Sequence, residues 1–507
     1  MNLSILIILP LLTALAILPF KELKQVRMIA LVGSSLQLIL AFVLLYFYWT
    51  ERSAGNAATM LFETNYVWYA SLNINYHIGV DGISVAMVLL TSFIVIAGIL
   101  VSWNVDKLSK EFFFLLLFLS VGAYGFFISL DLFTLFFFLE VAVIPKFLLI
   151  GIWGSGKKEY SAMKLALMLM GGSALVFVGL VGLYFNTNTG NGQHSFDIMQ
   201  IAAMNISPDV QKLFFPFAFV GFGIFGALFP FHTWVPDGHS SAPTAASMFL
   251  AGISMKLGGY GCLRVATFLM PDAAHQYSWI IIVLASIAII YGAFATMMQT
   301  DLKYINAYSS VSHCGFVLLG IGMLTKTAIT GAVMQMVSHG LMTALFFACI
   351  GMIYDRTHTR QMNQLGGLMK VMPFISTVFV IAGLCSLGLP GFSGFVAEMT
   401  VFMGSWQNAG DFYRIATIIA CASIVVTAVY ILRAIGKAIM GPLTPALSIN
   451  GEGVADLLDA QWNEKWAAGL LIIGIIAIGI APFWLNQLIG PGAETIMKNI
   501  DKISLLK

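Results

Sequence analysis

The stretch FPFHTWVPDGHSSAPTAASMFLAGISMKLGGYG, residues 229–261, decides how the chain folds. Its first half contains Pro230, Pro236 and Pro243, which interrupt a helix because proline lacks a backbone donor and clashes with the preceding turn. Its second half is an apolar run with Lys256 near its centre. An interrupted helix backbone and a charged residue in the middle of a span are tolerated inside the membrane only where protein or water surrounds them. The stretch therefore predicts a polar site inside a membrane-embedded helix bundle.

The composition of the whole chain also indicates a membrane protein. Of 507 residues, 59% are apolar and only 9% are charged, and the mean hydropathy is +0.91. A soluble domain carries about 25% charged residues, so this chain lacks the polar surface of a water-soluble globule. Its net charge of +2 excludes a polybasic nucleic-acid binder. We expect a lipid bilayer around the chain and no nucleic acid.

Apolar runs long enough to span a bilayer recur along the sequence. A spanning helix needs about 20 apolar residues. The pattern predicts an all-α polytopic membrane protein with about fourteen transmembrane helices. The predicted spans are 3–20, 28–49, 82–103, 112–130, 132–154, 163–186, 212–230, 243–270, 278–299, 304–323, 327–353, 373–405, 413–438 and 466–486.

A second interrupted span matches the first. The run SLGLPGFSGF, inside 373–405, contains Gly388, Pro390, Gly391 and Gly394. Two Gly/Pro-interrupted spans five helices apart indicate inverted repeats, here the fourth to eighth and the ninth to thirteenth helices. The predicted division is residues 1–110 for the first three helices, 111–270 and 271–440 for the two repeats, and 441–507 for a loop and the last helix.

The distribution of Lys and Arg predicts the orientation. Basic residues concentrate in the loops that follow the odd-numbered spans, which the positive-inside rule places in the cytoplasm. An even number of spans then puts both termini on the other side. We expect an integral multi-pass protein of a bacterial inner membrane, with both termini periplasmic. The residues that carry this bias include Lys21, Lys24, Lys107, Lys110, Lys157, Lys158, Arg356 and Arg360.

Cofactor motifs are missing from the sequence. The five cysteines form no CxxC pair, so neither a zinc site nor an iron–sulfur cluster is indicated. There is no GxGxxG motif after a strand and no Walker loop. We therefore expect no metal and no cofactor on this chain, and if it belongs to a redox machine another subunit holds the cofactor.

Several ionisable residues lie inside predicted spans, where charge is costly and indicates function. A row of amines, carboxylates and imidazoles can pass protons when water links them. Purely structural roles are the alternatives to proton transfer. A buried histidine can be a core residue whose ring nitrogens are hydrogen-bonded, and a lysine near a helix end, such as Lys164, can snorkel to the membrane interface. The candidates are Glu140, Lys146, Lys256, His313, His339 and Glu398.

Long motifs carry a family resemblance. The chain resembles the antiporter-like membrane subunit M (subunit 4 in mitochondria) of respiratory complex I, the proton-pumping NADH:quinone oxidoreductase. The matching stretches are residues 229–261, DLKYINAYSSVSHCGFVLLGIG at 301–322, GAVMQMVSHGLMTALFF at 331–347, MIYDRTHTR at 352–360 and SLGLPGFSGFVAE at 386–398.

The resemblance implies roles and partners. Proton-translocating roles fall on Glu140, Lys256, His313, His339 and Glu398, and supporting roles on Lys164, His232, Asp237 and His239. It implies a translocase subunit without redox chemistry of its own. Other membrane subunits, including further antiporter-like chains, would be its partners, and FMN, iron–sulfur clusters and quinone would belong to partner subunits.

One departure from the family stands out. The family usually has a lysine seven residues before His232, and here that position is Phe225. Lys146, six residues after Glu140, stands where the family more often has an apolar residue. We hypothesise that Lys146 replaces the missing lysine. Six residues of straight helix turn about 600°, which points Lys146 and Glu140 to different faces unless Pro145 bends the helix.

Three alternatives remain open at the level of sequence. Lys146 can be an unrelated snorkelling residue. The chain can belong to a multi-subunit sodium/proton antiporter, which shares the lysine–glutamate pattern but has no redox arm. It can also be a structural membrane subunit whose pumping is impaired, a reading that rests on Phe225 alone.

Overall fold

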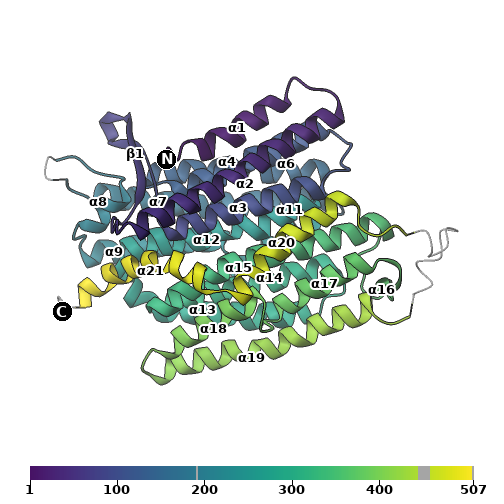
Figure 1. Cartoon of the computed structure of the whole chain (residues 1–507). Coiled ribbons are helices and arrows are strands. Elements are labelled where there is room, and N and C mark those ends of the chain that lie inside the picture. The colour runs from purple at the N-terminus through teal and green to yellow at the C-terminus, as the bar shows by residue number, and fades with distance from the viewer. Residues whose placement is uncertain (190–191, 443–456, 505–507) are drawn as a thin grey trace.

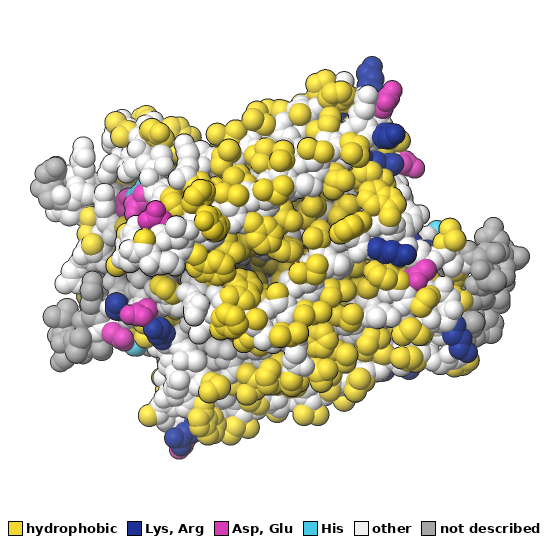
Figure 2. Space-filling view, viewed as in Figure 1, with side chains coloured by type: hydrophobic (Ala, Val, Ile, Leu, Met, Phe, Trp, Pro, Cys, Tyr) yellow, Lys and Arg dark blue, Asp and Glu magenta, His cyan; other side chains and the backbone are white. Residues whose placement is uncertain are grey.

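The helices run roughly side by side in one bundle (Figure 1). The computed structural model describes residues 1–189, 192–442 and 457–504. Both termini lie at the same end of the bundle, which we call the terminal end. Figure 2 shows a broad apolar wall between two rims where charged side chains gather. This distribution is the one expected for a bundle embedded in a bilayer.

The first part of the chain forms one shorter helix, three long helices and a hairpin. Strands β1 and β2 pair antiparallel at the terminal end, joined by a short 3₁₀ turn at Ala70–Leu72. Sequence patterns placed residues 50–79 outside the membrane but did not reveal these strands. The elements are α1 (Ile5–Ile17), α2 (Leu23–Ser53), β1 (Leu61–Tyr69), β2 (Ile74–Val80), α3 (Gly82–Val101) and α4 (Ser109–Ile128).

The middle of the chain contains helices that are repeatedly divided. The elements are α5 (Leu132–Val141), α6 (Val143–Trp153), α7 (Lys158–Phe185), α8 (Ile198–Ala203), α9 (Pro208–Phe225), η2 (Phe231–Thr233), α10 (Trp234–Ser241), α11 (Thr244–Phe249), η3 (Leu250–Ser254), α12 (Met255–Gly261) and η4 (Cys262–Thr267). The segments η3 and η4 are π-helical and flank α12, which carries Lys256. Single π-turns inside helices frequently mark functional positions.

The last part is again built from long helices. Its elements are α13 (Pro271–Met297), α14 (Leu302–Gly322), α15 (Lys326–Thr357), α16 (Leu368–Val371), α17 (Pro373–Ser386), α18 (Ser393–Trp406), α19 (Asp411–Ala434), η5 (Ile435–Ile439), α20 (Trp462–Ile480) and α21 (Phe483–Ser504). The sequence patterns missed α21, which follows α20 after a two-residue break. Most of the expected loop 441–464 lies outside the described residues.

The predicted polytopic helical class is confirmed. Among the described residues, nine helices are long and apolar enough to cross a membrane, and α1 and α17 are shorter apolar helices. Each predicted span overlaps helical structure, although several consist of two or more shorter helices. The number of fourteen crossings and the two inverted repeats remain predictions.

Helix α15 forms the centre of the bundle. The most apolar 18-residue segment of α15 is entirely buried, and the corresponding segment of α3 is almost entirely buried. In α2, α19 and α20, most residues of this segment are not buried. Helix α15 packs against α3, α11, α14, α17, α18, α20 and α21. A lipid-facing helix can be uniformly apolar, but a central helix can hold polar groups that its neighbours satisfy. His339 lies in the middle of α15.

The helix breaks lie where the sequence places proline and glycine. Pro145 has no backbone N–H, and the helix divides into α5 and α6 just before it, at Ala142. The gap between α17 and α18 contains Gly388 and Gly391, with φ of 73° and 98°. These left-handed values favour glycine, because a side chain there is strained. The breaks expose backbone and polar side chains to the interior of the bundle.

Candidate functional site

Lys256 is fully enclosed by protein. Its side chain is 1% exposed, and its Nζ donates to the carbonyl of Ala251 in η3 and lies 2.7 Å from Nδ1 of His339. The π-helical turn thus supplies a carbonyl to a lysine on the following helix. An amine within hydrogen-bond distance of an imidazole can exchange a proton with it directly.

His313 lies on the other side of His339. The two rings are 5.2 Å apart between centroids, and His313 comes from α14 while His339 comes from α15. Among the described residues, Nε2 of His339 has no hydrogen-bond partner. The imidazoles are thus neighbours, with ring planes tilted by 32°, and have no direct hydrogen bond.

Glu398 completes the row on α18. Its Oε1 is 3.4 Å from Nδ1 of His313, and both side chains are nearly buried. The other ring nitrogen of His313 lies 3.2 Å from Oγ of Ser386, at the end of α17. The carboxylate sits beside the α17–α18 break, since a Cβ on Gly388 would lie 2.6 Å from Oε2 of Glu398. The break therefore makes room for the acid.

Four of the candidate residues form one continuous row. Lys256, His339, His313 and Glu398 come from α12, α15, α14 and α18, and each is a close neighbour of the next. Gln335 lies one turn before His339, and its amide Nε2 donates to Nδ1 of His313 at 3.2 Å. Sequence inspection missed Gln335 and Ser386, because neutral polar residues in apolar runs carry no distinctive pattern.

Lys146 lies apart from this row, against Phe225. The side chain of Lys146 is fully buried, and Nζ is 5.8 Å from the centroid of the Phe225 ring on α9. Nζ has no hydrogen-bond partner among the described residues, and neither has Oε1 of Glu140. No ion pair joins Lys146 and Glu140 among the described residues. Their functional partnership therefore stays a prediction.

Phe225 also adjoins the Lys256 region. The next residue, Gly226, packs so closely against α12 that a Cβ on Gly258 would lie 2.2 Å from the Gly226 nitrogen. Gly226, Lys256 and Cys314 line a cavity of about 10 Å³. A volume of about 10–15 Å³ holds roughly one water molecule.

Lys164 and Asp237 form an ion pair at the end of the bundle opposite the termini. Nζ of Lys164, on α7, is 2.6 Å from Oδ2 of Asp237, on α10, and Tyr304 donates to Oδ1 of Asp237 at 3.3 Å. The side chains of Lys164 and Asp237 are about a quarter exposed. Lys164 thus extends toward the end of the bundle, where its amine forms an ion pair with Asp237.

His232 and His239 lie in the same broken region. His239 is completely buried, stacks on Phe347, and has no hydrogen-bond partner on either ring nitrogen among the described residues. His232 is also buried, with its ring 4.9 Å from that of Tyr291. Neither joins the row from Lys256 to Glu398 by a direct hydrogen bond.

Two further buried charges lie outside the candidate set. Lys303, at the start of α14, is buried and donates to the carbonyl of Ala242 at 2.7 Å. Arg264, inside the predicted span 243–270, is buried and pairs with Asp81, which also caps α3 by accepting from Ser84. Both contacts join segments that are far apart in the sequence, so they depend on the fold.

The polar arrangement contains no metal site. Among the described residues, no three or more His, Cys, Asp or Glu side chains are grouped so that they could hold a metal ion. The ionisable groups of the row can bind and transfer protons.

The fold and the buried row define the class: a polytopic helical membrane protein in which ionisable side chains lie between broken helices. Residues 129–425 match the profile of the NADH:quinone oxidoreductase/Mrp antiporter transmembrane family. The chain belongs to this family.

Curated relatives match over nearly the whole length. The chain is 36% identical to NAD(P)H-quinone oxidoreductase chain 4-2 of Synechocystis sp., covering 96% of this chain and 90% of that protein. It is 38% identical to NAD(P)H-quinone oxidoreductase chain 4 3 of Picosynechococcus sp., covering 98% and 94%. The resemblance to the subunit-4 type of chain is therefore confirmed.

Solved structures share the fold. A chain of respiratory complex I from Thermus thermophilus with bound NADH superposes with a TM-score of 0.87 at 23% identity, covering 98% of this chain and 99% of that one. A chain of the Mrp complex from Dietzia sp. superposes with a TM-score of 0.82 at 19% identity, covering 98% of each.

Proposed function

We propose that this chain is a proton-translocating membrane subunit of an NADH:quinone oxidoreductase complex. The observation that carries the proposal is the row of neighbouring side chains Lys256, His339, His313 and Glu398, which come from four helices inside the bundle. Buried ionisable groups are retained in membranes chiefly where they serve transport. The relatives, named as chain 4 of NAD(P)H-quinone oxidoreductases, support the assignment to such a complex.

In this proposal the row holds and moves protons. Lys256 and His339 exchange a proton across 2.7 Å, and His313 and Glu398 exchange one across 3.4 Å. The two histidines have no direct hydrogen bond, so transfer between them needs a ring movement or a water molecule. This gap is where a conformational change elsewhere in the complex can connect or disconnect the row.

We further propose that Lys146 is the amine partner of Glu140. The position that is lysine in the family is Phe225, and the Lys146 ammonium lies over that very ring. An ammonium over an aromatic face is attracted by the ring quadrupole. The buried amine therefore occupies the neighbourhood from which a lysine at 225 would act, but it originates on α6 instead of α9.

The chain itself carries no redox chemistry in this proposal. FMN, iron–sulfur clusters and quinone belong to partner subunits, and the other membrane subunits include further antiporter-like chains. The bacterial inner membrane, with both termini on the periplasmic side, is the proposed location. Fourteen crossings and two inverted five-helix repeats complete the proposed topology.

A gentle purification of the complex tests membership. Flavin and iron–sulfur subunits that copurify with this chain support the proposal. If only antiporter-type membrane chains copurify and the assembly exchanges sodium for protons, the chain belongs to a secondary antiporter, the second class that the family description names.

A further inference from the structure

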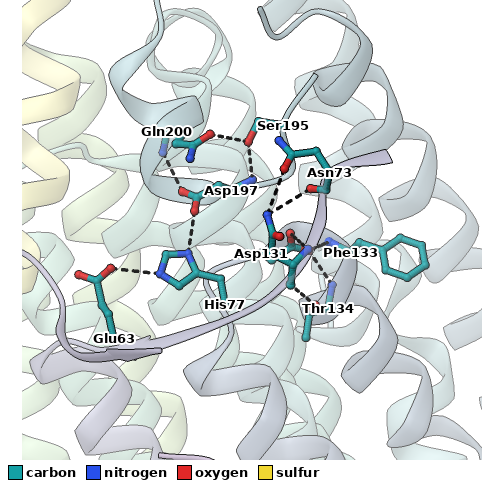
Figure 3. Close-up of polar contacts among 10 residues, drawn as sticks. Glu63, Asn73, His77, Asp131, Phe133, Thr134, Ser195, Asp197 and Gln200 are labelled. Carbon is teal, nitrogen blue, oxygen red and sulfur yellow. Dashed lines mark hydrogen bonds and ion pairs between the residues drawn. The ribbon is translucent and has the colours of Figure 1, made fainter. Parts of the chain in front are cut away.

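A second cluster of titratable groups lies at the terminal end, away from the row. His77 on β2 points between two carboxylates, with Nδ1 2.7 Å from Oδ2 of Asp197 and Nε2 3.1 Å from Oε2 of Glu63 (Figure 3). Glu63 is on β1, and Asp197 caps α8 by accepting from the N–H of Gln200. One imidazole therefore connects three parts of the chain.

The geometry requires a charged imidazole when both carboxylates are ionised. A carboxylate only accepts hydrogen bonds, and a neutral imidazole has one N–H donor. A neutral His77 could therefore donate to Asp197 or to Glu63, and its other nitrogen lone pair would face an acceptor. Binding one proton converts the imidazole to imidazolium and provides both donors.

The cluster lies against the start of α5, the helix that carries Glu140. The N–H of Leu130 donates to the carbonyl of His77 at 2.8 Å, and the N–H of Ile198 donates to the carbonyl of Leu130 at 2.8 Å. Asp131 caps α5 by accepting from Phe133 and Thr134, and it also accepts from the N–H of Asn75 on β2. The backbone that leads into α5 is thus held between the hairpin and the α8 segment.

The charged groups around His77 favour its protonated form. Burial lowers the pKa of His77, but hydrogen bonding to Asp197 and Glu63 and their charges raise it more, so the net shift is upward. Burial raises the pKa of Asp131, which lies behind Asp197, to about 6. His194 does not face His77, because its Nδ1 contacts the carbonyl of Thr187 and its ring packs on Tyr184. Glu63 is half-exposed, so it gives solvent protons access to the ring.

We propose that His77 is a proton-operated latch, which holds the β1–β2 hairpin and the α8 segment on the start of α5 when it is charged and releases them as the pH at the terminal end rises. Loss of the proton breaks one of the two bridges. The latch does not depend on proton pumping by the chain. If the chain does pump protons to this side, its own product closes the latch.

Hydrogen–deuterium exchange of the intact purified complex, followed by mass spectrometry, tests the latch. Exchange in peptides that cover residues 61–80 and 129–134 is measured from about pH 6 to about pH 9 and corrected for intrinsic rates. Losing a hydrogen bond between charged groups shifts a local opening equilibrium by roughly tenfold or more. We expect corrected exchange in these peptides to rise by roughly that factor toward alkaline pH, in one single-proton step.

Glu63→Gln is the decisive variant. The amide of a glutamine can donate to Nε2 of a neutral His77 while Nδ1–H still donates to Asp197. The latch should then stay closed at alkaline pH, whereas His77→Gln should leave it open at every pH. Asp209→Asn, an exposed carboxylate at the N-terminus of α9, is the matched control and should keep the wild-type profile. Wild-type exchange that does not change with pH, or an unaltered pH profile in Glu63→Gln, would overturn the proposal.

Discussion

The ammonium of Lys146 lies 5.8 Å from the centroid of the Phe225 ring, and the two residues belong to different helices, α6 and α9. Lys146 is fully buried and its amine makes no hydrogen bond within the described residues. An uncompensated buried amine costs several kcal/mol, roughly. Such a residue is better explained by a transport role than by packing.

Moving the amine between these two positions tests its role. Lys146→Met should abolish proton pumping, because it removes the buried amine over Phe225 that is the proposed partner of Glu140. Adding Phe225→Lys to that variant should restore much of the pumping, since the new amine on α9 enters the space that the Lys146 amine occupied beside residue 225. The measurement is the proton-to-electron ratio of the reconstituted complex. A normal proton-to-electron ratio in Lys146→Met would show that Lys146 has no role in proton translocation.

Removing the titratable ring of His313 should interrupt the row. His313→Gln can still hydrogen-bond with Ser386 and Gln335 but cannot carry a proton between His339 and Glu398. We expect about a tenfold or larger fall in pumping, with assembly of the complex retained. His358→Asn, at the left-handed C-cap of α15, serves as a control and should pump normally. Equal pumping by both variants would exclude His313 from the path.

The space beside Glu398 depends on Gly388. Alanine at 388 would adopt a φ of 73° and would place its Cβ 2.6 Å from Oε2 of Glu398. We expect Gly388→Ala to destabilise the protein by about 1–3 kcal/mol and to lower pumping, because the carboxylate must move away from His313. Thermal unfolding and pumping are measured together. Gly171→Ala has open space around its Cβ and should change neither; similar results for the two substitutions would contradict the steric account.

The buried pair of Arg264 and Asp81 connects η4 to the start of α3. Asp81→Asn leaves a buried guanidinium without its counter-ion, which should cost about 3–5 kcal/mol and reduce the amount of assembled complex. Replacing both partners, with Arg264→Met added, should recover most of that loss, because the double variant no longer buries an uncompensated charge. A double variant as unstable as Asp81→Asn would argue that Arg264 has other essential contacts.

The pH dependence of local stability follows from His77. Its pKa is raised in the folded protein, so its stabilising contribution is complete below the unfolded value of about 6.5 and disappears as the pH rises through the folded pKa. Limited proteolysis of the hairpin should therefore accelerate above neutral pH in the wild type. In His77→Gln the rate should not follow this step. A wild-type cleavage rate that falls with rising pH would contradict the sign of the linkage.

Sequence patterns predicted the helical elements well because each buried helix needs a long apolar run. Proline and glycine also located the breaks between Pro230 and Pro243 and around Gly388, whereas at Pro145 the sequence suggested a bend and the structure has a division. The hairpin was missed because its exposed aromatic residues, such as Trp68, resemble neither a span nor an alternating strand. The amphipathic α21 was missed because it is too polar for a hydropathy search.

The sequence predicted which residues form the candidate site but not which of them contact one another. Lys256, His313, His339 and Glu398 were conspicuous as ionisable residues in apolar runs. Their order in space depends on how four helices are rotated against each other, which local sequence does not determine. The same holds for Lys146, whose contact with Phe225 arises from the divided helix at Ala142.

The most direct test of the proton-translocating role is the proton-to-electron ratio of the reconstituted complex with Lys256→Met. Lys256 begins the row, and its amine has no substitute within the described residues that contacts His339. The account predicts a lower ratio in this variant, with a normal ratio in the control Lys24→Met, which removes an exposed lysine near the start of α2. A fully assembled Lys256→Met complex that pumps with the wild-type ratio would contradict the central claim.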